Sequence, residues 1–177
     1  MYQDMLSAWV RRFAPLIRRG GRVLDVAAGT GRHTRLLLDM GFAVTAVDRD
    51  ITELQPLAAR GCDVREVDLE SGQNWPLGDG YDGIIVTNYL HRPLLAPIAT
   101  ALAPDGVLIY ETFAVGNERL GRPHNPDFLL RPGELLTAFD RLTVIAFEQG
   151  EVSLPRPAVI QRIVAGPLGT LPAAFSL

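Results

Sequence analysis

The chain lacks or is poor in several residue types that would point to particular kinds of protein. It has no lysine, so all 17 of its basic residues are arginine and Schiff-base chemistry on a lysine is excluded. Its single cysteine, Cys62, allows neither an internal disulfide nor a cysteine cluster, and three scattered histidines form no metal-ligand pattern. We therefore expect no metal site, and the lone cysteine indicates a reducing compartment.

Long apolar runs and strong net charge are also missing. No apolar run approaches the ~18 residues of a membrane-spanning helix, and the first residues lack the basic and apolar segments of a secretion signal. The net charge of −3 gives no general attraction to nucleic acid. We expect a cytoplasmic protein without membrane attachment, folded as one domain over residues 1–177.

The strongest local motif lies in residues 23–34, where an apolar strand is followed by Asp25, then by Gly29 and Gly31, then by helical spacing. Glycines allow a ligand to lie against the backbone. A carboxylate at the strand end repels a pyrophosphate but attracts an ammonium and a sulfonium. The motif therefore favours S-adenosylmethionine over a dinucleotide, whose fingerprint would also need a third glycine where the chain has Thr34.

Two further predicted strands also end in acids. The strand 43–47 ends in Asp48, and the strand 63–67 ends in Asp68 and Leu69. Each aspartate by itself is more typical of a turn or a helix cap. Because three neighbouring strand ends carry one, a shared cofactor site is the better interpretation.

Strands and helices alternate from residue 22 to residue 111, which predicts an α/β fold with a doubly wound, mostly parallel sheet. The connection 68–80 is too rich in breakers for a long helix. Residues 142–148 and 158–165 predict a final antiparallel hairpin. We expect an N-terminal helix within residues 1–20, with its apolar face in the core, and a tail over 166–177 that docks or frays.

These motifs resemble those of class I S-adenosylmethionine-dependent methyltransferases, whose pattern is acid-x-Gly-x-Gly-x-Gly; here Ala27 stands in place of the first glycine. The resemblance implies a seven-stranded sheet of order 3-2-1-4-5-7-6. It also implies that Asp25 holds the methionine end of the cofactor, that Asp48 binds both ribose hydroxyls, and that Asp68 and Leu69 contact the adenine. The overall layout is similar to small bacterial methyltransferases of the tellurite-resistance and thiol-methylating type.

The methyl acceptor is expected beyond the strand 81–87, at the point where the strand order reverses. The residues that follow are Asn88, Tyr89, His91 and Arg92. We expect His91 to act as a base where one is needed, with Tyr89 and Asn88 positioning the acceptor. The alternative for His91 is a hydrogen-bonded structural residue.

A long polar loop, 114–128, contains Arg122 and His124 and has the length typical of a lid. Together with Arg92, these side chains are candidates to bind an anionic acceptor. The alternative is that the arginines are simply solvated.

Three functions remain open. A small-molecule methyltransferase is favoured by the single small domain and the mild acidity. An RNA or protein methyltransferase would need a basic surface, for which the arginines of the first helix are the only support. The third is a non-catalytic module that binds the cofactor or a partner. The sequence does not indicate an oligomeric state or the identity of the acceptor.

Overall fold

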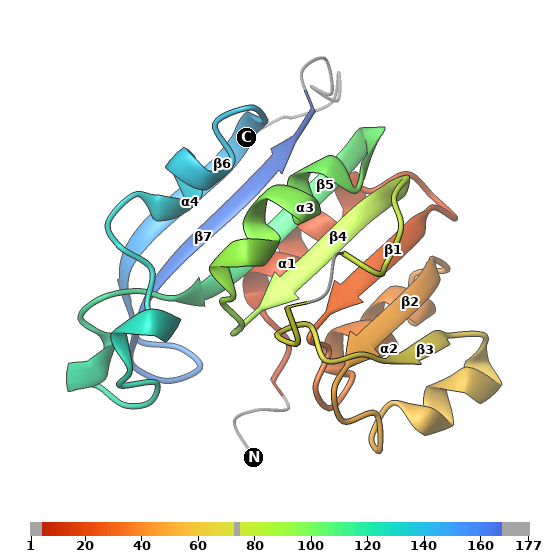
Figure 1. Cartoon of the computed structure of the whole chain (residues 1–177), viewed down its shortest axis with the longest axis horizontal. Helices are drawn as coiled ribbons and strands as arrows, with labels where there is room; N and C mark the ends of the chain where they lie inside the picture. Colours follow the sequence, from red (N-terminus) through yellow and green to blue (C-terminus); the bar gives the residue numbers. More distant parts are fainter. Residues whose placement is uncertain (1–4, 73–74, 168–177) are drawn as a thin grey trace.

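The computed structural model describes residues 5–72 and 75–167. They form a seven-stranded sheet of order β3-β2-β1-β4-β5-β7-β6 (Figure 1). The strands are β1 (Arg22–Val26), β2 (Ala43–Asp48), β3 (Asp63–Glu66), β4 (Tyr81–Thr87), β5 (Leu102–Phe113), β6 (Thr143–Val152) and β7 (Ala158–Gly166). The first five strands are parallel, and β7 is antiparallel to both β5 and β6. The expected sheet and its order are confirmed.

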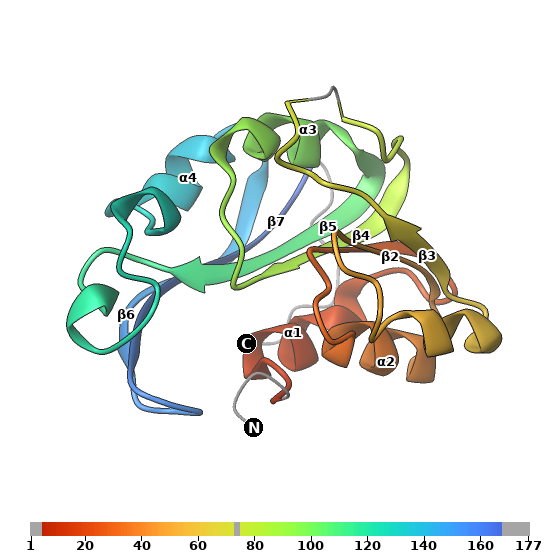
Figure 2. The same cartoon turned by 60° about the horizontal axis from the view of Figure 1, so that its bottom comes forward.

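Short helices cover both faces of the sheet, with α1 and α2 on one face and α3 and α4 on the other (Figure 2). The α-helices are α1 (Ala8–Phe13), α2 (Arg32–Asp39), α3 (Leu95–Thr100) and α4 (Glu134–Ala138). The 3-10 turns are η1 (Ala14–Leu16), η2 (Gln55–Arg60), η3 (Arg92–Leu94), η4 (Asn117–Arg119) and η5 (Pro126–Phe128).

The central strand β4 explains how the core is divided. All seven of its residues are buried, as its continuous apolar run predicts for a parallel strand covered on both faces. Successive side chains point to opposite faces, so Ile84 and Val86 pack with α3, whereas Ile85 packs with α1 and α2. The sheet is thereby held between two apolar layers, and its polar strand ends are left to form a site.

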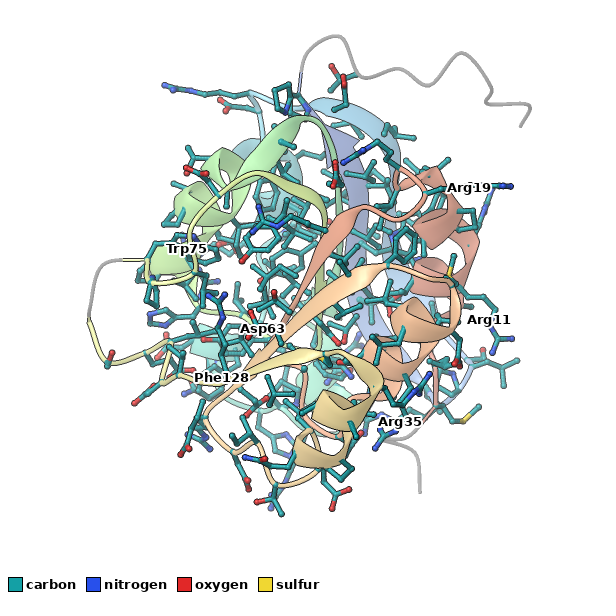
Figure 3. The ribbon with its side chains drawn as sticks, turned by 90° about the vertical axis from the view of Figure 1, so that its right-hand side faces the viewer. Arg11, Arg19, Arg35, Asp63, Trp75 and Phe128 are labelled. Atoms are coloured by element: carbon teal, nitrogen blue, oxygen red, sulfur yellow. The ribbon has the colours of Figure 1, made fainter. Side chains whose placement is uncertain are left out.

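The N-terminal helix is shorter than the expected range of 1–20. Its first turn is capped by Ser7, whose hydroxyl accepts hydrogen bonds from the N–H groups of Trp9 and Val10. The α-helix ends at Phe13, and the chain continues as the 3-10 turn that contains Pro15, because proline has no N–H to extend the helix. Arg11 of this helix and Arg19, in the turn after it, point outward in Figure 3, and residues 1–4 lie outside the described residues.

The connection between β3 and β4 is irregular over 69–72 and 75–80, as predicted. Within it, Trp75 packs against the core on the α3 face, and its indole N–H donates to the carbonyl of Gly78 at 2.6 Å. At the other end of the chain, Gly166 belongs to β7, and residues 168–177 of the expected tail lie outside the described residues. None of the helices in the described part of the chain is long and apolar enough to span a membrane.

Candidate active site

The three expected acids lie at or just beyond the carboxyl ends of adjacent strands, and one of them, Asp48, is held by the loop that follows β1. Asp48, the last residue of β2, accepts a hydrogen bond from the N–H of Gly29 through Oδ2 at 2.8 Å. Its other oxygen, Oδ1, accepts from the N–H of Asp50 at 3.1 Å. A carboxylate has about four lone-pair positions, so both oxygens can still accept ribose hydroxyls. Asp68 is exposed and accepts from the N–H of Glu70 at 2.9 Å, while Leu69 packs against the core.

The loop after β1 is built from left-handed backbone. Ala27, Gly29 and Gly31 have φ values of 52°, 55° and 75°. Ala27 is one of two non-glycine residues with positive φ in the described part of the chain, which explains why the family pattern has glycine at this position. A Cβ built on Gly29 would meet nothing within 4 Å, whereas one built on Gly31 would lie 2.8 Å from Leu54 and 3.0 Å from Leu57.

Gly29 and Gly31 should therefore respond differently to substitution. We expect Gly31→Ala to lower the free energy of unfolding by about 2–4 kcal/mol, because backbone strain adds to overpacking against two buried leucines. Gly29→Ala should lower the free energy of unfolding by about 1–2 kcal/mol, through backbone strain alone. It should also weaken cofactor binding, because the added Cβ enters the open space above the loop.

Gly41→Ala is the matched control. Gly41 has a φ of 83° and equally open surroundings, but it lies at the other end of α2. Denaturant unfolding and calorimetric binding of S-adenosylhomocysteine measure the two effects separately. Equal loss of affinity in Gly29→Ala and Gly41→Ala would show that the loop does not contact the cofactor.

Asp25 is the acid of the site whose pKa is shifted furthest from its usual value. It is 2% exposed, and its Oδ2 accepts a hydrogen bond from the hydroxyl of Thr34 at 2.6 Å. Burial raises the pKa of Asp25 to about 6, and the Thr34 hydrogen bond and the charge of Arg32 only partly offset it. A buried carboxylate with a raised pKa is the expected environment for a group that receives an ammonium.

This pKa predicts that cofactor binding depends on pH. A cationic ligand favours the ionised carboxylate, so the affinity for S-adenosylhomocysteine should be constant above about pH 6.5 and fall by up to about tenfold per unit below pH 6. Calorimetry from about pH 7.5 to pH 5 measures this, and Asp25→Asn should remove the pH dependence.

The same shift predicts the effect of Asp25 on stability. Its folded pKa lies above the value in an unfolded chain, so the stability that it contributes at low pH is lost as the pH rises through about 6. Asp25→Asn should therefore stabilise the free protein at about pH 7.5 while weakening its binding of the cofactor. A variant with unchanged stability and an unchanged binding profile would contradict the role of Asp25.

The residues expected to face the acceptor, Asn88, Tyr89 and His91, directly follow β4 in the chain. Asn88 is exposed and has a φ of 56°, so the chain turns sharply there. The hydroxyl oxygen of Tyr89 is buried without a hydrogen bond in the described part of the chain, and burial, followed by the charge of Glu70, raises its pKa above the usual range. His91 is half-buried and precedes η3.

Arg92 is already engaged by the loop that follows β5. Its Nε donates to Glu134 Oε1 at 2.7 Å, its Nη1 to the carbonyl of Asp127 at 2.7 Å, and its Nη2 to the carbonyl of Leu129 at 2.9 Å. Arg122 and His124 are exposed on the same loop, and His124 Nδ1 lies 3.2 Å from the carbonyl of Glu118. The guanidinium of Arg92 is thus bonded to groups of the chain itself, whereas the side chains of Arg122 and His124 are exposed.

Several polar residues that hold the site were missed by sequence reasoning. Asn117 is buried and ties the loop after β5 to Val159, and Gln161 is buried between Leu135 and Arg131. Nothing in the sequence marks them, because asparagine and glutamine are ordinary surface residues. Arg32, His33 and Thr87 meet between α2 and β4. The sequence marks Arg32 and His33 by their place directly after the glycine loop, which indicates packing or a cofactor contact for His33, but it does not pair either of them with Thr87. No group of potential metal ligands occurs among the described residues.

Comparison with known proteins identifies the family. A family model described as a methyltransferase domain matches residues 2–153. The chain belongs to this family. It is 24% identical to YqeM of Bacillus subtilis, named as a methyltransferase, over 77% of this chain and 70% of YqeM.

Two solved structures show the same fold. TehB of Haemophilus influenzae superposes with a TM-score of 0.77 at 16% identity, over 92% of this chain and 62% of TehB. The 1,6-didemethyltoxoflavin-N1-methyltransferase of Burkholderia thailandensis, crystallised with its substrate and S-adenosylhomocysteine, has a TM-score of 0.62 and 24% identity, over 89% of this chain and 77% of that one. The resemblance to the class I and tellurite-resistance-type methyltransferases is thereby confirmed.

The residues of this methyltransferase fit the cofactor of its family, S-adenosylmethionine. Gly29 leaves open space above the loop, and Asp48 keeps acceptor capacity. When bound, the cofactor supplies a methyl group on a positively charged sulfur. The acids at the strand ends carry the opposite charge.

Proposed function

We propose that this methyltransferase transfers the methyl group to a small-molecule nucleophile. The observation that carries the proposal is that the loop after β5 is held in place by Arg92, which lies just beyond β4. Arg92 bonds Glu134 and two loop carbonyls, and the two ends of the loop pair with each other, since the N–H of Val115 donates to the carbonyl of Leu130 at 3.0 Å. A loop fixed in this way favours a small acceptor bound in a pocket over a macromolecule bound on an open surface.

The proposed mechanism is an in-line displacement. The acceptor atom forms a bond to the methyl carbon while the carbon–sulfur bond breaks, and the electron pair of that bond stays on sulfur. Most of the acceleration comes from holding the acceptor in line and excluding water. Asn88 and Tyr89 position the acceptor, and His91 takes a proton where the acceptor must lose one.

We assign Arg92 the role of holding the loop, because it already donates four hydrogen bonds to Glu134 and to two loop carbonyls. Arg122 and His124 are the exposed candidates for contact with an anionic group on the acceptor. We further propose that the protein works in a bacterial cytoplasm. Cys62 is compatible with a reducing compartment, because burial raises its pKa to about 11 and keeps it an unreactive thiol.

Methyl-labelled cofactor separates the proposed function from its alternatives. The protein is incubated with a cell extract divided into small-molecule, RNA and protein pools, and label should appear in the small-molecule pool. Arg60→Gln, which removes only an exposed ion pair with Asp39, is the control that should retain transfer. Label confined to RNA or protein would assign a macromolecular acceptor, and label in no pool together with binding of the cofactor would indicate a non-catalytic module.

A further inference from the structure

Gln161 is a fully buried polar side chain in β7, where an apolar residue would be expected. The side chains two residues to either side, Val159 and Ile163, pack in the apolar core on the face of the sheet that α3 and α4 cover. We propose that Gln161 is a positioning residue, which fixes α4 and, through α4 and Arg92, the loop after β5. The proposal rests on the proposed function in one respect, namely that this loop borders the acceptor.

The side-chain amide of Gln161 is hydrogen-bonded through both its oxygen and its nitrogen. Its Oε1 accepts from the backbone N–H of Leu135 at 2.7 Å, and its Nε2 donates to the carbonyl of Arg131 at 3.0 Å. Its Nε2 also donates to Oε1 of Gln149, its cross-strand partner on β6, at 2.7 Å. That oxygen of Gln149 accepts in turn from the N–H of Gly133 at 2.8 Å. Because the backbone partners require a donor at one end of the amide and an acceptor at the other, its orientation is fixed.

These bonds hold the beginning of α4 against β6 and β7, over which the helix lies in Figure 1. A buried amide is costly unless its partners stay in place, so the network selects one position for α4. An apolar side chain at position 161 would fill the space without that selection. A polar residue that departs from the apolar pattern of its strand is expected where an exact position matters for function.

Glu134, in the first turn of α4, connects this network to the acceptor side. Its Oε1 accepts from Nε of Arg92 at 2.7 Å, and its Oε2 accepts from Nη2 of Arg92 at 3.0 Å and from the N–H of Arg131 at 2.7 Å. Arg92 directly follows His91 in the chain and donates to two carbonyls of the loop after β5. The position of α4 therefore sets the position of the loop and of the segment 88–92.

Hydrogen exchange of Gln161→Leu tests the proposal without a known acceptor. Leucine leaves the N–H of Leu135 and the carbonyl of Arg131 without their side-chain partner, so the start of α4 should open more often. Followed by mass spectrometry, the amides of 88–92 and 114–130 should exchange about 10-fold faster than in the wild type, and those of 23–34 should be unchanged. The affinity for S-adenosylhomocysteine should stay within about twofold.

Kinetics on an acceptor found with methyl-labelled cofactor give the second readout. In Gln161→Leu, kcat/KM for the acceptor should fall about 10- to 100-fold, with a raised acceptor KM, because a misplaced loop holds the acceptor poorly. A fold that is only less stable would instead lower kcat with the folded fraction and leave KM unchanged. If Gln161 acts through Arg92, the double variant Gln161→Leu/Arg92→Gln should lose no more than the worse single variant.

Thr45→Val is the matched control, since it also replaces a buried polar side chain of the sheet. Thr45 lies on β2, and its hydroxyl donates to Asp63 Oδ2 at 3.3 Å. This variant should keep the wild-type exchange over 114–130 and the wild-type acceptor KM. Gln149→Ala changes an exposed member of the network, so it should fold and show the pattern of Gln161→Leu with smaller changes.

A rise in exchange confined to 131–135, or an unchanged acceptor KM in folded Gln161→Leu, would contradict the proposal, because Gln161 would then only anchor α4. If Gln161→Leu did not fold, wild-type exchange over 114–130 in Gln149→Ala would overturn it. Losses that multiply in the double variant would contradict the route through Arg92. Label found only in RNA or protein would contradict the proposed function instead, a result that the exchange measurement does not depend on.

Discussion

Asp48→Ala is expected to weaken binding of S-adenosylhomocysteine by about 1.5–3 kcal/mol, or about 10- to 150-fold, because it removes hydrogen bonds between a carboxylate and two ribose hydroxyls. The carboxylate also accepts the N–H of Gly29, so the variant loosens the loop that faces the cofactor. Asp48 is half-buried at the end of a strand, and we expect little change in the free energy of unfolding. Calorimetric titration and denaturant unfolding measure the two quantities.

Asp50→Ala is the matched control for Asp48. It removes a neighbouring carboxylate whose partner is Thr52 rather than the glycine loop. Its affinity for S-adenosylhomocysteine should stay within a few-fold of the wild type. If Asp48→Ala also bound the ligand as tightly as the wild type, the ribose assignment would be wrong.

His91→Ala is expected to reduce turnover far more than cofactor affinity, since a residue that acts on the acceptor is needed only in the transition state. The loss should be about 10-fold for a thiol acceptor, whose thiolate forms readily, and about 10²–10⁴-fold for a hydroxyl or amine that needs a base. Single-turnover rates on an acceptor found with methyl-labelled cofactor measure it.

Chemical rescue separates a base from a structural histidine at position 91. Added imidazole should restore part of the turnover of His91→Ala if His91 moves a proton, and His91→Gln should remain as impaired as the alanine variant. Turnover of His91→Ala equal to that of the wild type would show that His91 is structural, and would direct attention to Tyr89 and His124.

The sheet could be predicted from the sequence because each parallel strand carries its own signal. β4 is a continuous apolar run between a breaker-rich connection and polar residues, and its predicted limits, 81–87, are those observed. β2 is predicted at 43–47 and observed over Ala43–Asp48 for the same reason. The position of the acids then follows, because parallel strands bring their carboxyl ends to one edge.

The helices were predicted less well because prolines and tertiary packing decide their form. Pro15 ends the first α-helix early, and Pro93 lies in a 3-10 turn ahead of α3. α3 itself covers only Leu95–Thr100, since the chain enters β5 at Leu102. Apolar spacing predicts which face is buried, but it does not distinguish an α-helix from tighter turns on the same face.

The site could be predicted only where a motif carries it. Asp25, Gly29, Gly31 and Asp48 stand in a recognisable pattern, and the structure brings them to one edge of the sheet. Thr87 and His33 are 54 positions apart and share a hydrogen bond that no spacing rule predicts. Arg92 was expected to face the acceptor, but its side chain meets Glu134 42 positions away, a contact that depends on how the loop after β5 folds back.

The central claim is that the acidic strand ends and the glycine loop bind S-adenosylmethionine rather than a dinucleotide. Calorimetric titration of the wild-type protein with S-adenosylhomocysteine and, separately, with NAD tests it most directly. We expect saturable binding of S-adenosylhomocysteine and no measurable binding of NAD, because Asp25 opposes a pyrophosphate and Thr34 stands where the third glycine would be. Tight binding of NAD with none of S-adenosylhomocysteine would contradict it.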